Sequence, residues 1–172
     1  MKLNVITVGK VLITDKLPFG VEDFLRRIEI LYASLLQRGK FLPPSCLRAE
    51  VSLSFVESSK IRELNLNYRE VDAPTDILSF PLWEEDSVFS PPQDWECLPL
   101  GDIVICPERV IYNSSENNKS FIQELVLVMS HGLLHLLGYD HNDSESELRM
   151  WAEQDKMVDQ FFREGDNGYD KS

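Results

Sequence analysis

Cysteine is scarce in this chain of 172 residues, and the three that are present give no sign of a disulfide framework. Cys46, Cys97 and Cys106 are odd in number and form no CxxC pair, which favours reduced thiols in a cytosolic protein. Long apolar runs are also missing, since none approaches the ~18 residues that a membrane span needs. Residues 1–10 hold no sustained apolar region of the kind found in a signal peptide. We therefore expect a cytoplasmic protein.

Positively charged residues are also fewer than negatively charged ones. The chain has 17 Lys and Arg against 29 Asp and Glu, which gives a formal net charge of −12 at pH 7. This balance argues against broad electrostatic capture of nucleic acid or of an anionic membrane. A local basic cleft stays compatible with it.

Histidine is rare too, yet all three histidines fall within residues 131–141. His131 and His135 have the i, i+4 spacing that places two side chains on one face of a helix, about 5–6 Å apart at Cβ. Gly138 follows at a position where a residue in the left-handed conformation would end that helix. The chain could then turn back and bring His141 next to His131 and His135. Three histidine ligands suit one zinc ion and leave a coordination position open, as catalytic zinc sites do.

The histidine pattern matches that of the metzincin proteases except at one position. Those proteases read HExxHxxGxxH, and Gly132 stands here where they have the glutamate that acts as general base. A glycine within a helix costs about 1 kcal/mol relative to alanine, so a compensating role is expected. Either it allows close packing against a neighbouring strand, or it leaves room for a bulky anionic group such as a phosphate beside the metal.

Hydrophobic periodicity predicts an α+β fold in which a small sheet is covered by helices. We expect one domain over residues 1–165 and a polar C-terminal tail over residues 166–172, with fraying from Arg163 onward. The acidic, proline-rich residues 83–99, which include Trp83 and Trp95, are predicted to form a surface loop. Strands are predicted at residues 3–8, 51–55, 75–80 and 101–106. Helices are predicted at residues 21–37 and from Ser58 or Ser59 to Arg69. Three further helices are predicted to begin at Pro107, at Lys119 or Ser120 (this one continues through the histidines), and at Asn142 or Asp143.

The same periodicity predicts which side chains of the helices are buried. On the histidine helix they are Phe121, Leu125, Val128 and Met129. On the helix that ends near Arg69 they are Ile61, Leu64 and Tyr68, and on the last helix they are Leu148, Trp151, Met157, Val158 and Phe161.

Three stretches, in order along the chain, resemble the YbeY family of bacterial single-strand endoribonucleases, which act in ribosomal RNA maturation. The most specific is His131-Gly-Leu-Leu-His-Leu-Leu-Gly-Tyr-Asp-His141. The others are Leu64-Asn-Leu-Asn-Tyr-Arg69 followed by Pro74-Thr-Asp-Ile-Leu-Ser-Phe-Pro81, and Leu100-Gly-Asp-Ile-Val-Ile105. The resemblance covers residues 50–160. It implies a small mixed sheet packed with helices, of which a zincin-like helix carries the metal ligands.

Residue by residue, the resemblance makes His131, His135 and His141 the ligands of one Zn²⁺ ion. It makes Arg69 the basic residue that faces the metal across the cleft and stabilises charge on the phosphoryl group. It implies single-stranded ribosomal RNA as substrate, small-subunit ribosomal proteins or assembly factors as partners, and roles in ribosomal RNA processing and ribosome quality control. Neither DNA nor a membrane is expected as a partner.

Several points stay open at the level of sequence. Lys60, Arg62 and Arg69 are candidates for a basic rim of the cleft. Asp140 can form a turn, orient a ligand, accept a proton or supply a fourth zinc ligand. Four protein ligands would favour a non-catalytic ribosome-assembly factor with a structural zinc, and a zincin-like peptidase is disfavoured by Gly132. Two features depart from the family pattern: the polar Ser130 before the first histidine, and the long acidic loop at 83–99.

Overall fold

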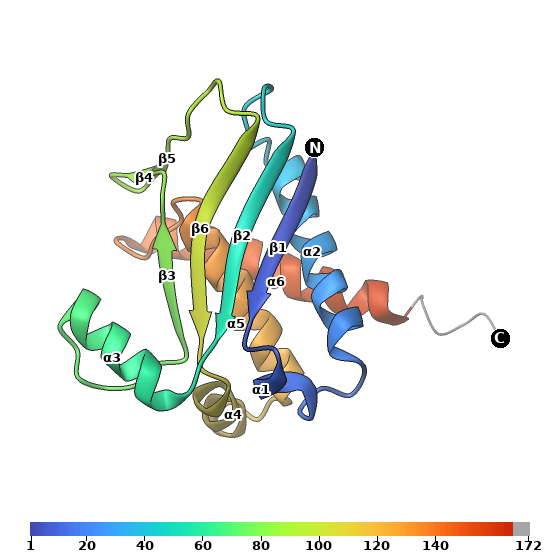
Figure 1. Cartoon of the computed structure of the whole chain (residues 1–172), viewed down its shortest axis with the longest axis vertical. Helices are drawn as coiled ribbons and strands as arrows, with labels where there is room; N and C mark the ends of the chain where they lie inside the picture. Colours follow the sequence, from blue (N-terminus) through green and yellow to red (C-terminus); the bar gives the residue numbers. More distant parts are fainter. Residues whose placement is uncertain (167–172) are drawn as a thin grey trace.

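A four-stranded mixed sheet forms the centre of the molecule (Figure 1). The structure is a computed structural model and describes residues 1–166, so the predicted tail lies outside the described residues from position 167 onward. The strand order is β1-β2-β6-β3. β1 (Lys2–Val8), β2 (Arg48–Phe55) and β6 (Cys97–Ile105) run parallel, whereas β3 (Ile77–Pro81) is antiparallel to β6 at the edge of the sheet. The predicted α+β class and mixed sheet are confirmed.

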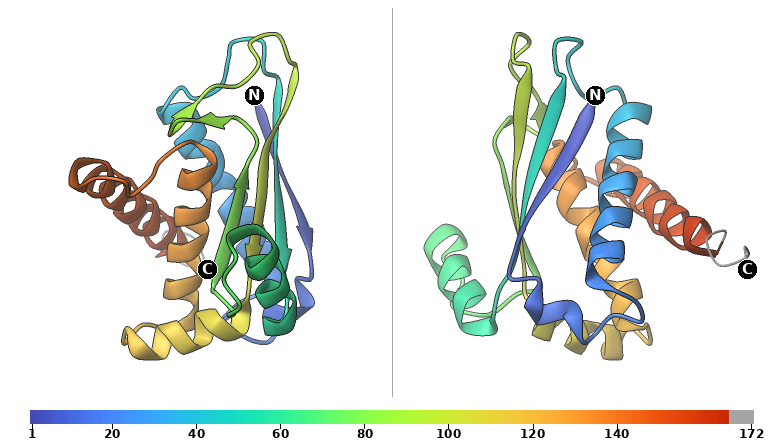
Figure 2. Two further views of the ribbon diagram at one scale, coloured as in Figure 1. Left: turned by 90° about the vertical axis from the view of Figure 1, so that its left-hand side faces the viewer. Right: turned by 45° about the vertical axis from the view of Figure 1, so that its right-hand side comes forward.

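The helices cover the two faces of the sheet unequally (Figure 2). α2 (Val21–Arg38), α5 (Phe121–Leu136) and α6 (Ser144–Asp166) pack on one face, and α3 (Ser58–Arg69) lies on the other. α1 (Val11–Thr14) and α4 (Pro107–Glu116) lie beyond the ends of the parallel strands. Among the described residues, no helix has both the length and the hydropathy needed to cross a bilayer.

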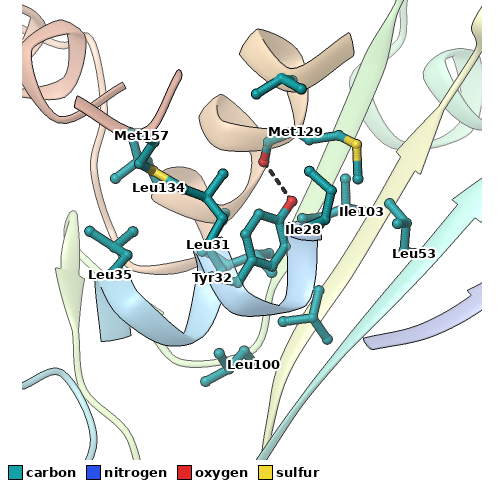
Figure 3. Packing of buried hydrophobic residues seen from close by; sticks show 14 of the residues in the cluster. Ile28, Leu31, Tyr32, Leu35, Leu53, Leu100, Ile103, Met129, Leu134 and Met157 are labelled. Atoms are coloured by element: carbon teal, nitrogen blue, oxygen red, sulfur yellow. Dashed lines mark hydrogen bonds between the residues drawn. The ribbon is translucent and has the colours of Figure 1, made fainter. Parts of the chain in front are cut away.

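The main core lies between the sheet and α2, α5 and α6, and it fixes the helix that carries the first two histidines (Figure 3). Tyr32 of α2 is fully buried, and its hydroxyl donates a hydrogen bond of 2.7 Å to the backbone carbonyl of Met129 in α5. Leu134 of α5 and Met157 of α6 are fully buried in the same cluster. The histidine helix is therefore held on several sides by apolar packing.

The segment predicted as a surface loop at 83–99 contains more structure than its composition indicated. β4 (Glu84–Glu85) and β5 (Val88–Phe89) form a short hairpin, and β6 begins at Cys97, ahead of the predicted start at Gly101. The Trp83 indole donates to the Pro99 carbonyl at 2.6 Å and packs edge-on against Trp95, with ring centroids 5.3 Å apart. These aromatic contacts attach the acidic segment to the sheet.

The predicted apolar face of the last helix is wrong at two positions. Leu148 is 63% exposed and Trp151 is 47% exposed, whereas Met150 between them is fully buried. Met150, Met157 and Phe161 recur at helical spacing and face the core, which turns the neighbours of Met150 outward. β3 also differs slightly, since it begins at Ile77 and includes Pro81, which an edge strand tolerates.

Candidate metal centre

α5 begins and continues in a way that delivers two histidines to one place. A capping box starts the helix: Gln123 N–H donates to Ser120 Oγ at 3.3 Å, and Ser120 N–H donates to Gln123 Oε1 at 2.8 Å. Ser130 is fully buried, and its hydroxyl donates to the Val126 carbonyl one turn earlier, at 2.8 Å. The polar residue before His131 is therefore satisfied within the helix and leaves the histidines undisturbed.

The three histidines converge as the sequence spacing predicted. His131 Nε2 and His135 Nε2 are 3.0 Å apart, and one ring nitrogen from each histidine lies within 4.8 Å of the others. Two nitrogens bound to one zinc ion at about 2.0–2.1 Å in tetrahedral geometry are roughly 3.3 Å apart, so the observed spacing fits such an ion. His141 stacks on His131 with an angle of 19° between the rings. The group could hold a metal ion.

The turn after α5 brings in the third histidine. Gly138 has φ +86°, a conformation that L side chains rarely adopt, and its N–H donates to the His135 carbonyl. A Cβ at this position would lie 3.0 Å from the backbone nitrogen of Phe89 and 3.2 Å from the Ser87 carbonyl oxygen. The β4–β5 hairpin therefore packs directly against the turn. Asn142 adds a side-chain hydrogen bond to Ser87 at 3.3 Å.

Asp140 stabilises the turn and is not part of the group that could hold a metal ion. Its carboxylate accepts hydrogen bonds from the backbone N–H of Asn142 at 3.1 Å and from the Asn142 side chain at 2.9 Å. A side-chain hydrogen bond with Ser87 and the backbone bond from Asn142 lower the pKa of Asp140. Among the described residues, the cluster able to hold a metal at this place consists of the three histidines alone.

Burial favours the neutral form of His131 and His135, the form in which a histidine can bind a metal. Burial lowers the pKa of His131, although a hydrogen bond with Gln154 of α6 acts the other way. Burial and the proximity of His131 and His141 lower the pKa of His135 to about 4. His131 Nδ1 lies 3.0 Å from Gln154 Oε1, and with this nitrogen as the donor, Nε2 is left free to bind a metal.

Gly132 faces the sheet rather than the three histidines. A Cβ there would lie 2.7 Å from Ile77 Cδ1 and 3.1 Å from Ile103 Cγ2, and Gly132 does not line the cleft at the histidines. Of the two roles that the sequence leaves open for Gly132, the structure supports close packing and not space for a phosphate. Close approach of α5 to β3 and β6 explains the residue.

A cleft of about 690 Å³ opens over the histidines, and its opposite wall comes from the end of α3, from β3 and from the hairpin. Arg69 lines this cleft and is exposed, and no described residue forms an ion pair with it. α3 ends at Arg69, and the next residue, Glu70, has a left-handed φ of 59°. The Asn65 side chain then donates to the Ala73 carbonyl at 2.8 Å, which fixes the path of the chain after Arg69.

The predicted basic rim is reduced to Arg69. Lys60 pairs with Glu63 at 3.3 Å and Arg62 pairs with Asp72 at 2.7 Å, and neither cation lines the cleft. Arg69 is the only Lys or Arg among the lining residues, which also include the carboxylates of Asp76, Glu84 and Asp140. Without a metal ion the cleft is therefore acidic overall.

Two residues at this site escaped the sequence-based prediction. Tyr68 was assigned to the buried face of its helix, but it lines the cleft and is 67% exposed. The feature of the sequence that could have identified Tyr68 as a cleft residue is its position next to Arg69. Gln154 lies 23 residues beyond His131, and only the packing of α6 on α5 brings the two together, so no local pattern could have identified it.

The chain matches the family model described as Endoribonuclease YbeY over residues 14–162. It is 43% identical over 113 residues to a protein named Endoribonuclease YbeY from Macrococcus caseolyticus, which covers 66% of this chain and 72% of that protein. It is 36% identical over 152 residues to the protein of the same name from Acetivibrio thermocellus, covering 85% and 91%. The solution structure of TM1509 from Thermotoga maritima is similar with a TM-score of 0.59 and 29% identity, covering 99% of this chain and 96% of that one.

Proposed function

The chain belongs to the YbeY endoribonuclease family, a family of RNA-hydrolysing enzymes, and we propose that it is a zinc-dependent endoribonuclease specific for single-stranded RNA. One observation carries the proposal: three histidine nitrogens converge within 4.8 Å of one another in a cleft whose opposite wall carries one free guanidinium. This arrangement supports a metal ion at one wall of the cleft and a phosphate-binding cation at the other.

The histidines and Arg69 have different roles in the proposed reaction. His131, His135 and His141 would hold one Zn²⁺ ion, which supplies a Lewis acid for a phosphoryl oxygen and lowers the pKa of water. Arg69 binds the phosphate oxygens in pairs through its planar fork and stabilises the charge that develops on them. Gln154 keeps the His131 ring in the orientation and tautomer that ligation needs.

The products of cleavage distinguish two routes for the attack on phosphorus. Attack by the RNA 2′-OH leaves a 2′,3′-cyclic phosphate, whereas attack by water with cleavage of the other ester bond leaves a 5′-phosphate. Analysis of the product ends by mass spectrometry identifies the nucleophile.

We further propose that the substrate is ribosomal RNA during maturation and quality control, in the cytoplasm. The formal charge of −12 leaves the surface outside the cleft acidic, which suits docking to a basic small-subunit ribosomal protein that delivers the RNA. The free cysteines are consistent with a reducing compartment.

The test is cleavage of an end-labelled single-stranded fragment of ribosomal RNA by the purified, zinc-loaded protein. We expect cutting that disappears with a chelator and in His135→Ala, which rules out a contaminating nuclease. Arg69→Lys is expected to bind zinc normally and lose most cleavage, while Arg62→Lys, an arginine of the same helix outside the cleft, serves as the matched control. A zinc-loaded protein that binds RNA without cutting it would favour an assembly factor instead.

A further inference from the structure

Tyr68 presents an aromatic ring to solvent inside the histidine cleft. The residue lines the cleft together with Arg69 and is 67% exposed, although Ile61 two turns earlier in α3 is fully buried. Phe80 of β3, which also lines the cleft, packs edge-on against the ring, with centroids 5.0 Å apart and an interplanar angle of 66°. The ring is thus held in place at the cleft while most of its surface stays free.

The charge balance of the cleft limits how much of the affinity for RNA can come from phosphate contacts. The cleft is lined by one guanidinium and three carboxylates, which together carry a formal net charge of about −2. A divalent ion at the histidines would bring this net charge only to zero. Proteins that bind single strands combine phosphate contacts in a positively charged groove with stacking of bases on aromatic rings. With one arginine in the cleft, stacking has to supply a larger share of the affinity. An exposed tyrosine beside the only arginine of the cleft supplies such a ring.

The adjacency of the two residues relates the ring to the reacting phosphate. Tyr68 and Arg69 are consecutive, so a phosphate held by Arg69 has a neighbouring base within reach of Tyr68. A base in a duplex already has stacking partners on both faces and a paired edge, whereas an unpaired base can turn toward the ring. The same contact would therefore select single strands.

We propose that Tyr68, supported by Phe80, is the binding platform on which an unpaired base next to the scissile phosphate stacks, a role that rests on the proposed endoribonuclease function. Tyr68 is thus a residue that determines specificity for unpaired RNA. It acts on binding, and the chemical step depends on the histidines and Arg69.

Two measurements test this role with the whole chain of 172 residues. The first is the steady-state cleavage of single-stranded RNA by the zinc-loaded enzyme. Removal of one stacking ring weakens binding of a single strand about 5- to 150-fold, so Tyr68→Leu is expected to raise KM by about that factor with kcat nearly unchanged. Tyr68→Phe keeps the ring and is expected to keep the wild-type KM.

The second measurement is direct binding of a short RNA that carries 2-aminopurine, with the chelated protein so that no cleavage occurs. Stacking quenches 2-aminopurine fluorescence, and the quenching should be present in the wild type and in Tyr68→Phe and absent in Tyr68→Leu. The dependence of Kd on salt should be shallow, with a slope near −0.7 for each phosphate contact. That slope should be unchanged by Tyr68→Leu, because the substitution removes no charge.

Tyr112→Leu is the matched control, because Tyr112 of α4 is 53% exposed, packs against Arg109 and does not line the cleft. It should leave both readouts unchanged. An unchanged KM in Tyr68→Leu would overturn the platform while leaving the nuclease in place. Equal loss in Tyr68→Phe and Tyr68→Leu would also overturn it, since the hydroxyl and not the ring would then matter. A wild-type protein without metal-dependent cleavage would refute the proposed function, and the quenching experiment would then still show whether Tyr68 stacks on an unpaired base.

Discussion

Replacing Gly132 by alanine tests whether this glycine serves packing or catalysis. Alanine would add a Cβ 2.7 Å from Ile77 Cδ1, and 3.1 Å and 3.3 Å from two methyl carbons of Ile103. Ile103 is fully buried and has little space to move, whereas the Ile77 methyl is the end of a side chain that borders the cleft. The clash therefore has to be relieved mainly by Ile77.

The expected magnitude follows from two opposing terms. Overpacking of a well-filled core costs about 1–3 kcal/mol, and the higher helix propensity of alanine returns about 1 kcal/mol. We expect Gly132→Ala to lower the free energy of unfolding by about 1 kcal/mol, which corresponds to a Tm lower by about 2–4 °C for a domain of this size. The Ile77→Val background removes the closest methyl, so the same substitution should cost almost nothing there.

Urea unfolding of the metal-free single and double variants measures this coupling, and zinc titration of each variant shows whether the site is preserved. Zinc affinity should stay close to that of the wild type, because Gly132 points away from the ligands. The packing explanation is refuted if Gly132→Ala stabilises the protein, or if its cost is the same with and without Ile77→Val. A stable variant with normal zinc affinity and greatly reduced turnover would restore the phosphate-space hypothesis.

Three further predictions concern the ligands and their helix. The pKa of His135 is about 4 in the folded, metal-free protein but about 6.5 in the unfolded chain, so the unfolded state takes up a proton first as the pH falls. The free energy of unfolding should therefore fall as the pH drops from about 6.5 to about 4. The midpoints of urea unfolding should show a weaker fall over this range in His135→Gln. Gln154→Ala removes the partner of His131 Nδ1 and should weaken zinc binding about 10–100-fold in competition titrations, whereas exposed Gln93→Ala, remote from the histidines, should not. Ser120→Ala breaks the capping box and should cost about 1 kcal/mol of unfolding free energy; an unchanged urea midpoint would contradict this role.

The sequence was most informative where a local pattern determines the structure. The spacing of His131, His135 and His141, with Gly138 between them, predicted their convergence, because helical geometry and one left-handed glycine fix their relative positions. The cap at Ser120 was also predictable, since it needs only neighbouring residues. Arg69 was assigned to the cleft from a family resemblance, and the structure places it among the lining residues; its role in catalysis stays a prediction.

The remainder depended on contacts between distant parts of the chain. Tyr68 was assigned to the buried face by its apolar character, but the ring it contacts belongs to Phe80 in another element. The pairing of Arg62 with Asp72 removed a predicted cation from the rim, and helical spacing alone does not reveal a partner ten residues away. The hairpin within residues 83–99 is short and polar, so its anchoring through Trp83 had no periodic signature.

The two walls of the cleft come from separate stretches of the chain. The histidine wall is one short segment whose helix is fixed by buried contacts such as that of Tyr32 with Met129. The facing wall consists of the end of α3, β3 and the hairpin, and its side chains are largely accessible. The hairpin packs against the turn that leads to His141, so substitutions at the exposed end of α3 are the ones that cost the three histidines least. A chain built in this way can change what its cleft accepts through residues at the end of α3 while it keeps the three histidines in place.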